Sequence, residues 1–122
     1  AMSAHSLSTY LRVVDTDSRN GMRVAVWHKP NAAPSGSRIQ GCWEPVLVRV
    51  PQGRRGRADG LKATKDVLTA NSPRQGFTGS KPPAWTRWVL DLMGYDPVDD
   101  TVTDLFHGSG AVANEAAQGV FI

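Results

Sequence analysis

The chain lacks the residues from which disulfide frameworks and metal centres are built. Cys42 is the only cysteine among 122 residues, so no internal disulfide can form, and the three histidines have no metal-ligand spacing. No apolar run approaches the roughly 18 residues of a membrane span, and the N-terminus has no apolar signal-peptide core. These absences lead us to expect a soluble, cytoplasmic protein that uses neither a metal nor a membrane.

The composition suits one small domain. With 40% hydrophobic residues, a chain of this length can bury about two thirds of its unfolded surface in a single core. Ala1 and Met2 resemble a cloning remnant, and we therefore assign the domain to residues 3–122.

Positive charge is concentrated in one stretch. Residues 51–65 carry five basic side chains against one acidic side chain, which gives this stretch a net charge of +4 in a chain of +3. Such a segment can neutralise several nucleic-acid phosphates, or it can be a solvated loop that keeps the protein soluble. Both interpretations stay open, because no aromatic side chain is interleaved to stack on a base. The basic residues are Arg54, Arg55, Arg57, Lys62 and Lys65.

Apolar periodicity predicts the secondary structure of the first two thirds. Residues 7–14 have apolar side chains at helical spacing, and Asn20-Gly21 marks a stop. Residues 24–27 and 46–50 are predicted strands, because they are rich in β-branched and aromatic residues. Residues 51–80 contain five glycines and two prolines, which predicts a long loop with one turn of helix near residues 62–68.

The last third predicts a helix followed by a βα unit. Pro82-Pro83 opens a helix that Gly94 ends, and Trp85, Trp88, Val89 and Leu92 form its apolar face. A polar loop over residues 96–100, a strand over residues 101–106 and a helix over residues 109–118 follow. We expect all four tryptophans, Trp27, Trp43, Trp85 and Trp88, to pack in the protein interior.

A glycine turn follows the predicted strand 101–106. Gly108 and Gly110 lack a Cβ atom and let a ligand approach the backbone, while the start of the next helix offers unpaired N–H groups. The turn is typical of nucleotide sites, although a glycine turn between a strand and a helix more often binds nothing.

Four segments together carry a family resemblance. Asp104, Phe106, Gly108 and Gly110 fit the pattern Asp-x-Phe-x-Gly-x-Gly, and residues 23–31, 43–48 and 81–85 precede it in a fixed order. In this order the chain resembles the end of the exocyclic-amino DNA methyltransferases, the adenine-N6 and cytosine-N4 enzymes, in their permuted, beta-type arrangement. The glycine pattern resembles the S-adenosylmethionine loop of that family, and residues 23–31 and 43–48 resemble the two strands that follow its catalytic motif.

The resemblance implies a fold and a set of sites. The fold would be α/β, an incomplete Rossmann-like methyltransferase sheet with flanking helices and a long basic loop, residues 51–80, in the target-recognition position. S-adenosylmethionine would lie against Asp104, Phe106, Gly108 and Gly110, with Thr78 and Lys81 at its methionine end. The five basic residues of the 51–65 stretch would contact DNA. A lysine before Pro-Pro is equally an ordinary start of a helix.

The family's catalytic machinery is absent from these 122 residues. No Asn/Asp-Pro-Pro-aromatic tetrapeptide occurs, and the family's acidic ribose-binding residue, one strand beyond the glycine loop, is also missing. We therefore expect no methyl transfer by the chain alone. One interpretation is a methyltransferase remnant or one part of a split enzyme that binds S-adenosylmethionine or DNA. The alternative is a non-enzymatic phage or mobile-element protein that uses the same scaffold to bind a host protein.

The missing motif also predicts a gap in the sheet. In the family, the strand that leads into the catalytic tetrapeptide lies between the strands that correspond to residues 24–27 and 101–106. Unpaired backbone groups at such a gap cost about 1 to 3 kcal/mol each if they are buried. The two strands could pair directly, or another chain could supply the missing strand. We favour the second route, as a homodimer.

Overall fold

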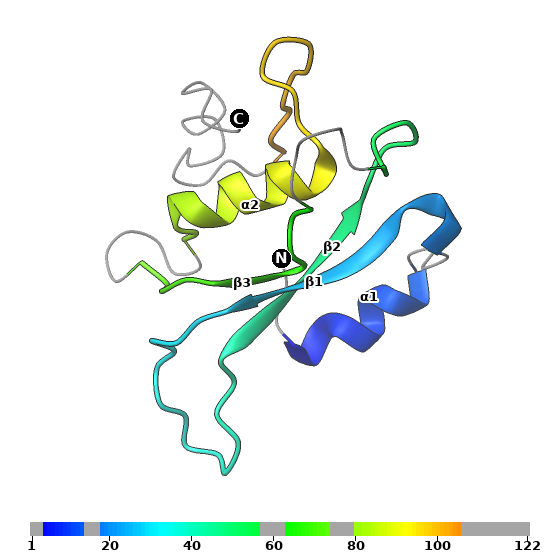
Figure 1. Cartoon of the computed structure of the whole chain (residues 1–122). Coiled ribbons are helices and arrows are strands. Elements are labelled where there is room, and N and C mark those ends of the chain that lie inside the picture. The colour runs from blue at the N-terminus through cyan, green and yellow to red at the C-terminus, as the bar shows by residue number, and fades with distance from the viewer. Residues whose placement is uncertain (1–3, 14–17, 57–62, 74–79, 106–122) are drawn as a thin grey trace.

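The computed structural model describes residues 4–13, 18–56, 63–73 and 80–105 of the chain. Two helices and three strands form the framework (Figure 1). In chain order the elements are a 3-10 helix at Ala4–Ser6, α1 at Leu7–Val13, a second 3-10 helix at Ser18–Asn20, β1 at Met22–His28, β2 at Trp43–Arg49, β3 at Val67–Thr69 and α2 at Pro83–Met93.

The three strands form one open, mixed sheet in the order β2-β1-β3. β1 and β2 are antiparallel over their full length, with Met22 opposite Arg49 and His28 opposite Trp43. β3 runs parallel to β1 and pairs only with its last three residues, from Val26 to His28. The described residues therefore have a small α/β fold, and the central strand is β1.

Pro45 indicates why β2 lies at an edge. The Lys29 N–H donates to the Cys42 carbonyl and the Val50 N–H donates to the Gly21 carbonyl, and in an antiparallel ladder every second residue pair is hydrogen-bonded in this way. Pro45 and Val26 form one of the intervening pairs, so the backbone nitrogen of Pro45 points away from β1. Proline has no N–H to donate and is tolerated in sheets mainly at such outer positions. The side chain of Pro45 is nevertheless fully buried.

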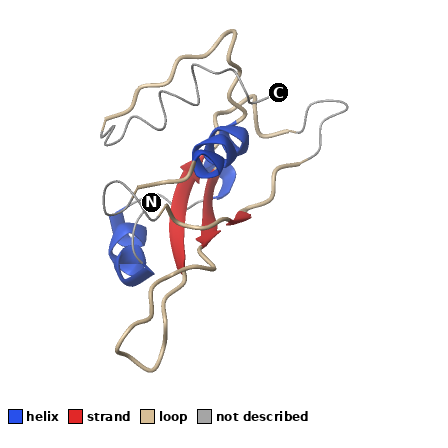
Figure 2. Cartoon of the chain, turned by 90° about the vertical axis from the view of Figure 1, so that its left-hand side faces the viewer, coloured by secondary structure: helices blue, strands red, loops and turns tan. Residues whose placement is uncertain are grey.

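The hydrophobic core lies between α2 and one face of the sheet. Ala25 and Trp27 of β1, Val46 and Val48 of β2 and Trp88 of α2 form its buried centre. Figure 2 shows α2 on one side of the sheet and α1 on the other. Trp27 and Trp88 confirm the prediction that they pack in the interior, Trp85 is half-buried against the same core, and Trp43 is 38% exposed.

Two tryptophan indoles hold β3 against the rest of the fold. The Trp88 Nε1–H group donates to the carbonyl oxygen of Lys65, just before β3, at 2.7 Å. The Trp27 Nε1–H group donates to the carbonyl oxygen of Ala70, just after β3, at 2.9 Å. A strand of three residues makes few ladder bonds, so these two side-chain bonds fix both of its ends.

Both ends of α2 agree with its sequence. Pro83 occupies the first helical position, where its missing N–H is not needed. Gly94 adopts the left-handed conformation, with φ 71°, and donates to the Asp91 carbonyl, while the Tyr95 N–H donates to the Leu90 carbonyl. This pair of bonds terminates the helix and satisfies two of its last carbonyls. Gly21 also has a positive φ of 78°, but it follows the 3-10 helix at Ser18–Asn20, and α1 itself already ends at Val13.

Two expectations about the second half of the chain are wrong. Residues 63–66 form no helix, because the chain there extends into β3, whose β-branched Val67 and Thr69 pair along β1. Residues 101–105 form no strand, and Leu105 is 79% exposed. Direct pairing of residues 24–27 with residues 101–105, the route that we did not favour, does not occur, because β3 of the same chain takes that edge of β1 at Val26–His28. The predicted helix at residues 109–118 lies outside the described residues.

The indole bonds of Trp88 lead to a test of the β3 attachment. Trp88→Phe removes the donor to Lys65 and keeps an aromatic ring, and we expect it to lower the free energy of unfolding by about 1 to 3 kcal/mol. Trp85→Phe is the matched control, because the Trp85 Nε1 atom is buried without a hydrogen-bond partner among the described residues. Urea unfolding of both variants measures the difference. Equal destabilisation by the two substitutions would contradict the role of the indole bond.

Candidate functional site

The carboxyl ends of the parallel strands β1 and β3 meet at one edge of the sheet. In open α/β sheets this edge is the usual position of ligand sites. His28 ends β1, and its Nδ1 atom lies 3.3 Å from the Thr69 Oγ1 atom at the end of β3. The connection over residues 29–42 leaves the sheet here and projects away from it before β2 begins (Figure 1).

Five side chains gather at this edge and form what we call the lysine-tryptophan cluster, namely Trp27, Lys29, Glu44, Lys81 and Trp85. The ammonium groups of Lys29 and Lys81 lie 5.3 Å and 5.4 Å from the centre of the Trp27 ring. Lys81 also lies 5.8 Å from the centre of the Trp85 ring. Contacts of this kind contribute about 0.5 to 2 kcal/mol each, more where water is excluded. The cluster therefore positions both ammonium groups on one tryptophan.

Glu44 links the two lysines. Its Oε2 atom lies 3.1 Å from the Lys29 Nζ atom, and its Oε1 atom lies 4.0 Å from the Lys81 Nζ atom. The lysine side chains are 23% and 22% exposed, so both are partly accessible to solvent. Glu44 comes from the start of β2 and Lys81 from the residues just before α2, so the cluster ties three distant parts of the chain together.

A hollow of about 720 Å³ adjoins the cluster. Lys29, Asn31 and Pro34 line it from the 29–42 connection, and Ser72 and Pro73 line it from the segment after β3. The Asn31 side chain joins the two walls, since its Nδ2 atom donates to the Ser72 carbonyl at 2.9 Å and its Oδ1 atom accepts from the Ser72 N–H at 2.8 Å. The hollow is therefore held by a pair of hydrogen bonds rather than by loose loops.

The structure describes two of the six residues predicted to bind the cofactor. Lys81 lies in the lysine-tryptophan cluster, and Asp104 is half-buried in the segment after α2. Thr78, Phe106, Gly108 and Gly110 lie outside the described residues. The sequence did not indicate that Trp27, Lys29 and Glu44 would surround Lys81, because their positions along the chain have no common spacing.

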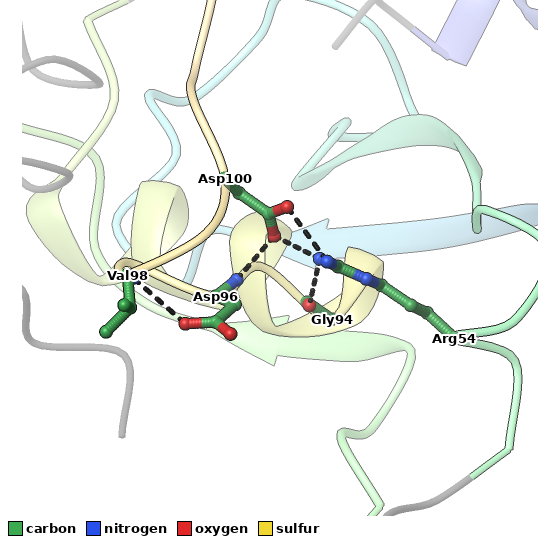
Figure 3. A network of polar contacts seen from close by, with 5 residues as sticks. All are labelled: Arg54, Gly94, Asp96, Val98 and Asp100. Atoms are coloured by element: carbon green, nitrogen blue, oxygen red, sulfur yellow. Dashed lines mark hydrogen bonds and ion pairs between the residues drawn. The ribbon is translucent and has the colours of Figure 1, made fainter.

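Arg54, which the sequence predicts as a DNA contact, is held within the fold (Figure 3). Its guanidinium pairs with both carboxylate oxygens of Asp100, with Nη2 to Oδ1 at 2.8 Å, and its Nη1 atom also donates to the Gly94 carbonyl at 2.9 Å. The Asp100 carboxylate accepts the backbone N–H of Asp96 at 2.7 Å as well. The acidic loop at residues 96–100 is thus a loop, as predicted, with a bracing role that its sequence did not indicate.

The hydrogen bond from Arg54 lowers the pKa of the Asp100 carboxyl, and the Asp96 N–H lowers it further. Arg54 and Asp100 also form part of the wall of a second hollow, of about 460 Å³, with Leu90, Met93 and Val102 beside them. Nearby, burial raises the pKa of Asp91, and Arg87 partly opposes that rise.

The other predicted DNA contacts differ in their surroundings. The Arg55 side chain donates to two backbone carbonyls, those of Val50 at 3.1 Å and Arg19 at 2.7 Å. Lys65 is exposed, and Arg57 and Lys62 lie outside the described residues. The predicted basic loop therefore contains two arginines that fasten the residues after β2 to neighbouring loops.

Comparison of the chain with protein-family models, with curated proteins and with solved structures gives no match. No helix within the described ranges has the length and apolar character needed to cross a bilayer. The same ranges contain no group of three side chains that could hold a metal ion.

The Arg54–Asp100 pair predicts a pH dependence of stability. The folded-state pKa of Asp100 is lowered from an unfolded value of about 3.9, so the pair stabilises the fold above that pH. Its contribution is lost as the pH falls through the lower folded-state value. Asp100→Asn should therefore be less stable than the wild type at pH 7, and the difference should shrink below about pH 4.

Urea unfolding between pH 3 and 7 measures this difference. Asp99→Asn is the control, because it removes the same charge from an exposed neighbouring position. A stability difference between Asp100→Asn and the wild type that stays constant over the whole range would contradict the ionic role of the pair.

Proposed function

We propose that the chain is a methyltransferase-like unit, equivalent to the cofactor-loop end of an exocyclic-amino DNA methyltransferase, with an incomplete Rossmann-like sheet. It binds S-adenosylmethionine and contacts DNA, and it depends on a second chain for catalysis. The lysine-tryptophan cluster is the observation that carries the proposal.

The cluster supports the proposal because it joins the segments in which the resemblance lies. Trp27 and Lys29 belong to residues 23–31, Glu44 belongs to residues 43–48, and Lys81 and Trp85 belong to residues 81–85. These segments are far apart in the chain, and ion-pair and ring contacts bring them to the carboxyl edge of the parallel strands. Their meeting at the edge where ligands usually bind supports the proposal.

The described part of the cofactor site fits the proposal at Lys81. The side chain lies just before α2, beside the rings of Trp27 and Trp85. S-adenosylmethionine supplies an activated methyl group when it is bound. The residues that would hold it are Lys81 and Asp104 together with Thr78, Phe106, Gly108 and Gly110 from outside the described ranges.

Catalysis by the chain alone is not part of the proposal. In-line methyl transfer requires the target amino group to be held in position, and positioning of this kind accounts for about 7 to 11 kcal/mol of a reaction barrier. The tetrapeptide that does so in the family is absent from the sequence. A complementing chain would have to supply the motif.

Calorimetric titration with S-adenosylmethionine and S-adenosylhomocysteine tests the cofactor role. We expect both ligands to bind and Lys81→Met to weaken binding by roughly tenfold, which corresponds to the loss of one charged contact. Arg49→Met, at the opposite end of the β1–β2 ladder, should leave binding unchanged. The absence of binding heat would favour the alternative, a non-enzymatic protein that binds a host protein.

Transfer of a labelled methyl group to DNA by the chain alone would refute the predicted inactivity.

Salt dependence tests the DNA role. The five predicted basic residues can neutralise at most about five phosphates, so the slope of log K against log salt should be no steeper than about −4.5. We expect weak binding without sequence preference, measured by fluorescence anisotropy of a labelled duplex. Lys65→Ala should flatten the slope by about one unit, because this side chain is exposed. Affinity that does not change with salt would rule out this basic stretch as a phosphate-binding segment.

A further inference from the structure

The hollow beside the lysine-tryptophan cluster has the features of a ligand site of its own. Its volume of about 720 Å³ lies within the range of about 300 to 1,000 Å³ that is usual for small-molecule sites. Pro34 and Pro73 give it apolar surface, and Lys29 is the charged side chain in its lining. The lining as a whole is more polar than apolar, which suits a charged ligand better than a purely apolar one.

The walls of the hollow are fixed before any ligand arrives. The two hydrogen bonds between Asn31 and Ser72 join the 29–42 connection to the segment after β3. The Gln40 Nε2 atom donates to the Ala32 carbonyl at 2.9 Å, which closes the connection on itself. A site that is already ordered loses less conformational entropy on binding.

The charge at the end of the hollow favours an anion. Glu44 accepts contacts from both Lys29 and Lys81, so a single carboxylate is shared between two ammonium groups. The Lys29 ammonium group lies 5.3 Å from the centre of the buried Trp27 ring, and the Lys29 side chain as a whole is 23% exposed. A lysine held in this way presents a positioned charge rather than a freely rotating one, and phosphate is an anion that lysine binds well.

We propose that this hollow binds a phosphate-bearing nucleotide, with the phosphate on the Lys29 ammonium group and the nucleoside between Pro34 and Pro73. The nucleotide is either free or part of a single strand, since both present the same phosphate and base. This inference goes beyond the function proposed above, because Lys29 and the other residues that line the hollow are among neither the predicted cofactor contacts nor the predicted DNA contacts. It can therefore fail or succeed independently of cofactor binding.

The indole N–H signal of Trp27 in a 15N-correlated NMR spectrum provides a local readout, since the Lys29 ammonium lies 5.3 Å from that ring. Titration with a deoxynucleoside monophosphate and with a short single-stranded oligodeoxynucleotide should shift the signal. Loss of a hydrogen bond to a charged group weakens binding by roughly 10-fold to 100-fold, and we expect this effect for Lys29→Met. Lys29→Arg, which keeps the charge, should retain binding.

Two further variants separate a specific site from general charge. Glu44→Gln removes the shared carboxylate without changing side-chain size and should strengthen nucleotide binding. Arg49→Met removes one positive charge at the far end of the β1–β2 ladder and should have no effect. Preserved dispersion of the indole signals in each variant shows that the fold is intact.

The outcomes are distinct. Binding of the monophosphate supports the proposal with a free nucleotide as the ligand, and binding of the oligonucleotide alone supports it with a strand as the ligand. No shift with either probe, or equal weakening by Lys29→Met and Arg49→Met, would overturn it. Equal binding of a glutamate-rich peptide would assign the hollow to acidic peptides and would also overturn it.

Discussion

The hydrogen bonds that Trp27 and Trp88 make on either side of β3 are the constraint on which the rest of the structure depends. β3 has only three residues, and the indoles of a strand and a helix hold its two flanking carbonyls, those of Lys65 and Ala70. Both indoles lie in the same core as Ala25 and Val46. The two rings are therefore buried with their N–H groups hydrogen-bonded. The same bonds hold β3 parallel to β1.

Trp27 connects this constraint to the candidate site. One side chain fixes the end of β3, fills the core and lies beneath the ammonium groups of Lys29 and Lys81. Glu44 then holds both lysines at the carboxyl edge of the sheet. Trp27 thus both stabilises the fold and positions the two lysines, so the geometry of the lysines depends on the packing of the core.

The basic stretch after β2 contributes more to the fold than its composition indicates. The Arg54 side chain donates to the Asp100 carboxylate and the Gly94 carbonyl, and the Arg55 side chain donates to the carbonyls of Val50 and Arg19. These bonds join the segment after β2 to the end of α2 and to the residues before β1. A nucleic acid would have to compete with these bonds, and at Lys29 and Lys81 it would have to compete with Glu44, whereas the Lys65 side chain is exposed.

The sequence by itself determined the elements whose signals are local. Helical spacing and the Pro-Pro start predicted α2, β-branched residues predicted β1 and β2, and Gly94 marked the end of α2, where a positive φ is needed. Tertiary structure alone decided the place of residues 67–69, the irregular course of residues 101–105 and the pairing of Arg54 with Asp100. The first and the last of these outcomes depend on partners more than 40 residues away in the chain, β1 for β3 and Asp100 for Arg54. Periodicity carries no information about such partners, because it reports which face of an element is apolar and not which distant backbone edge or carboxylate will meet it.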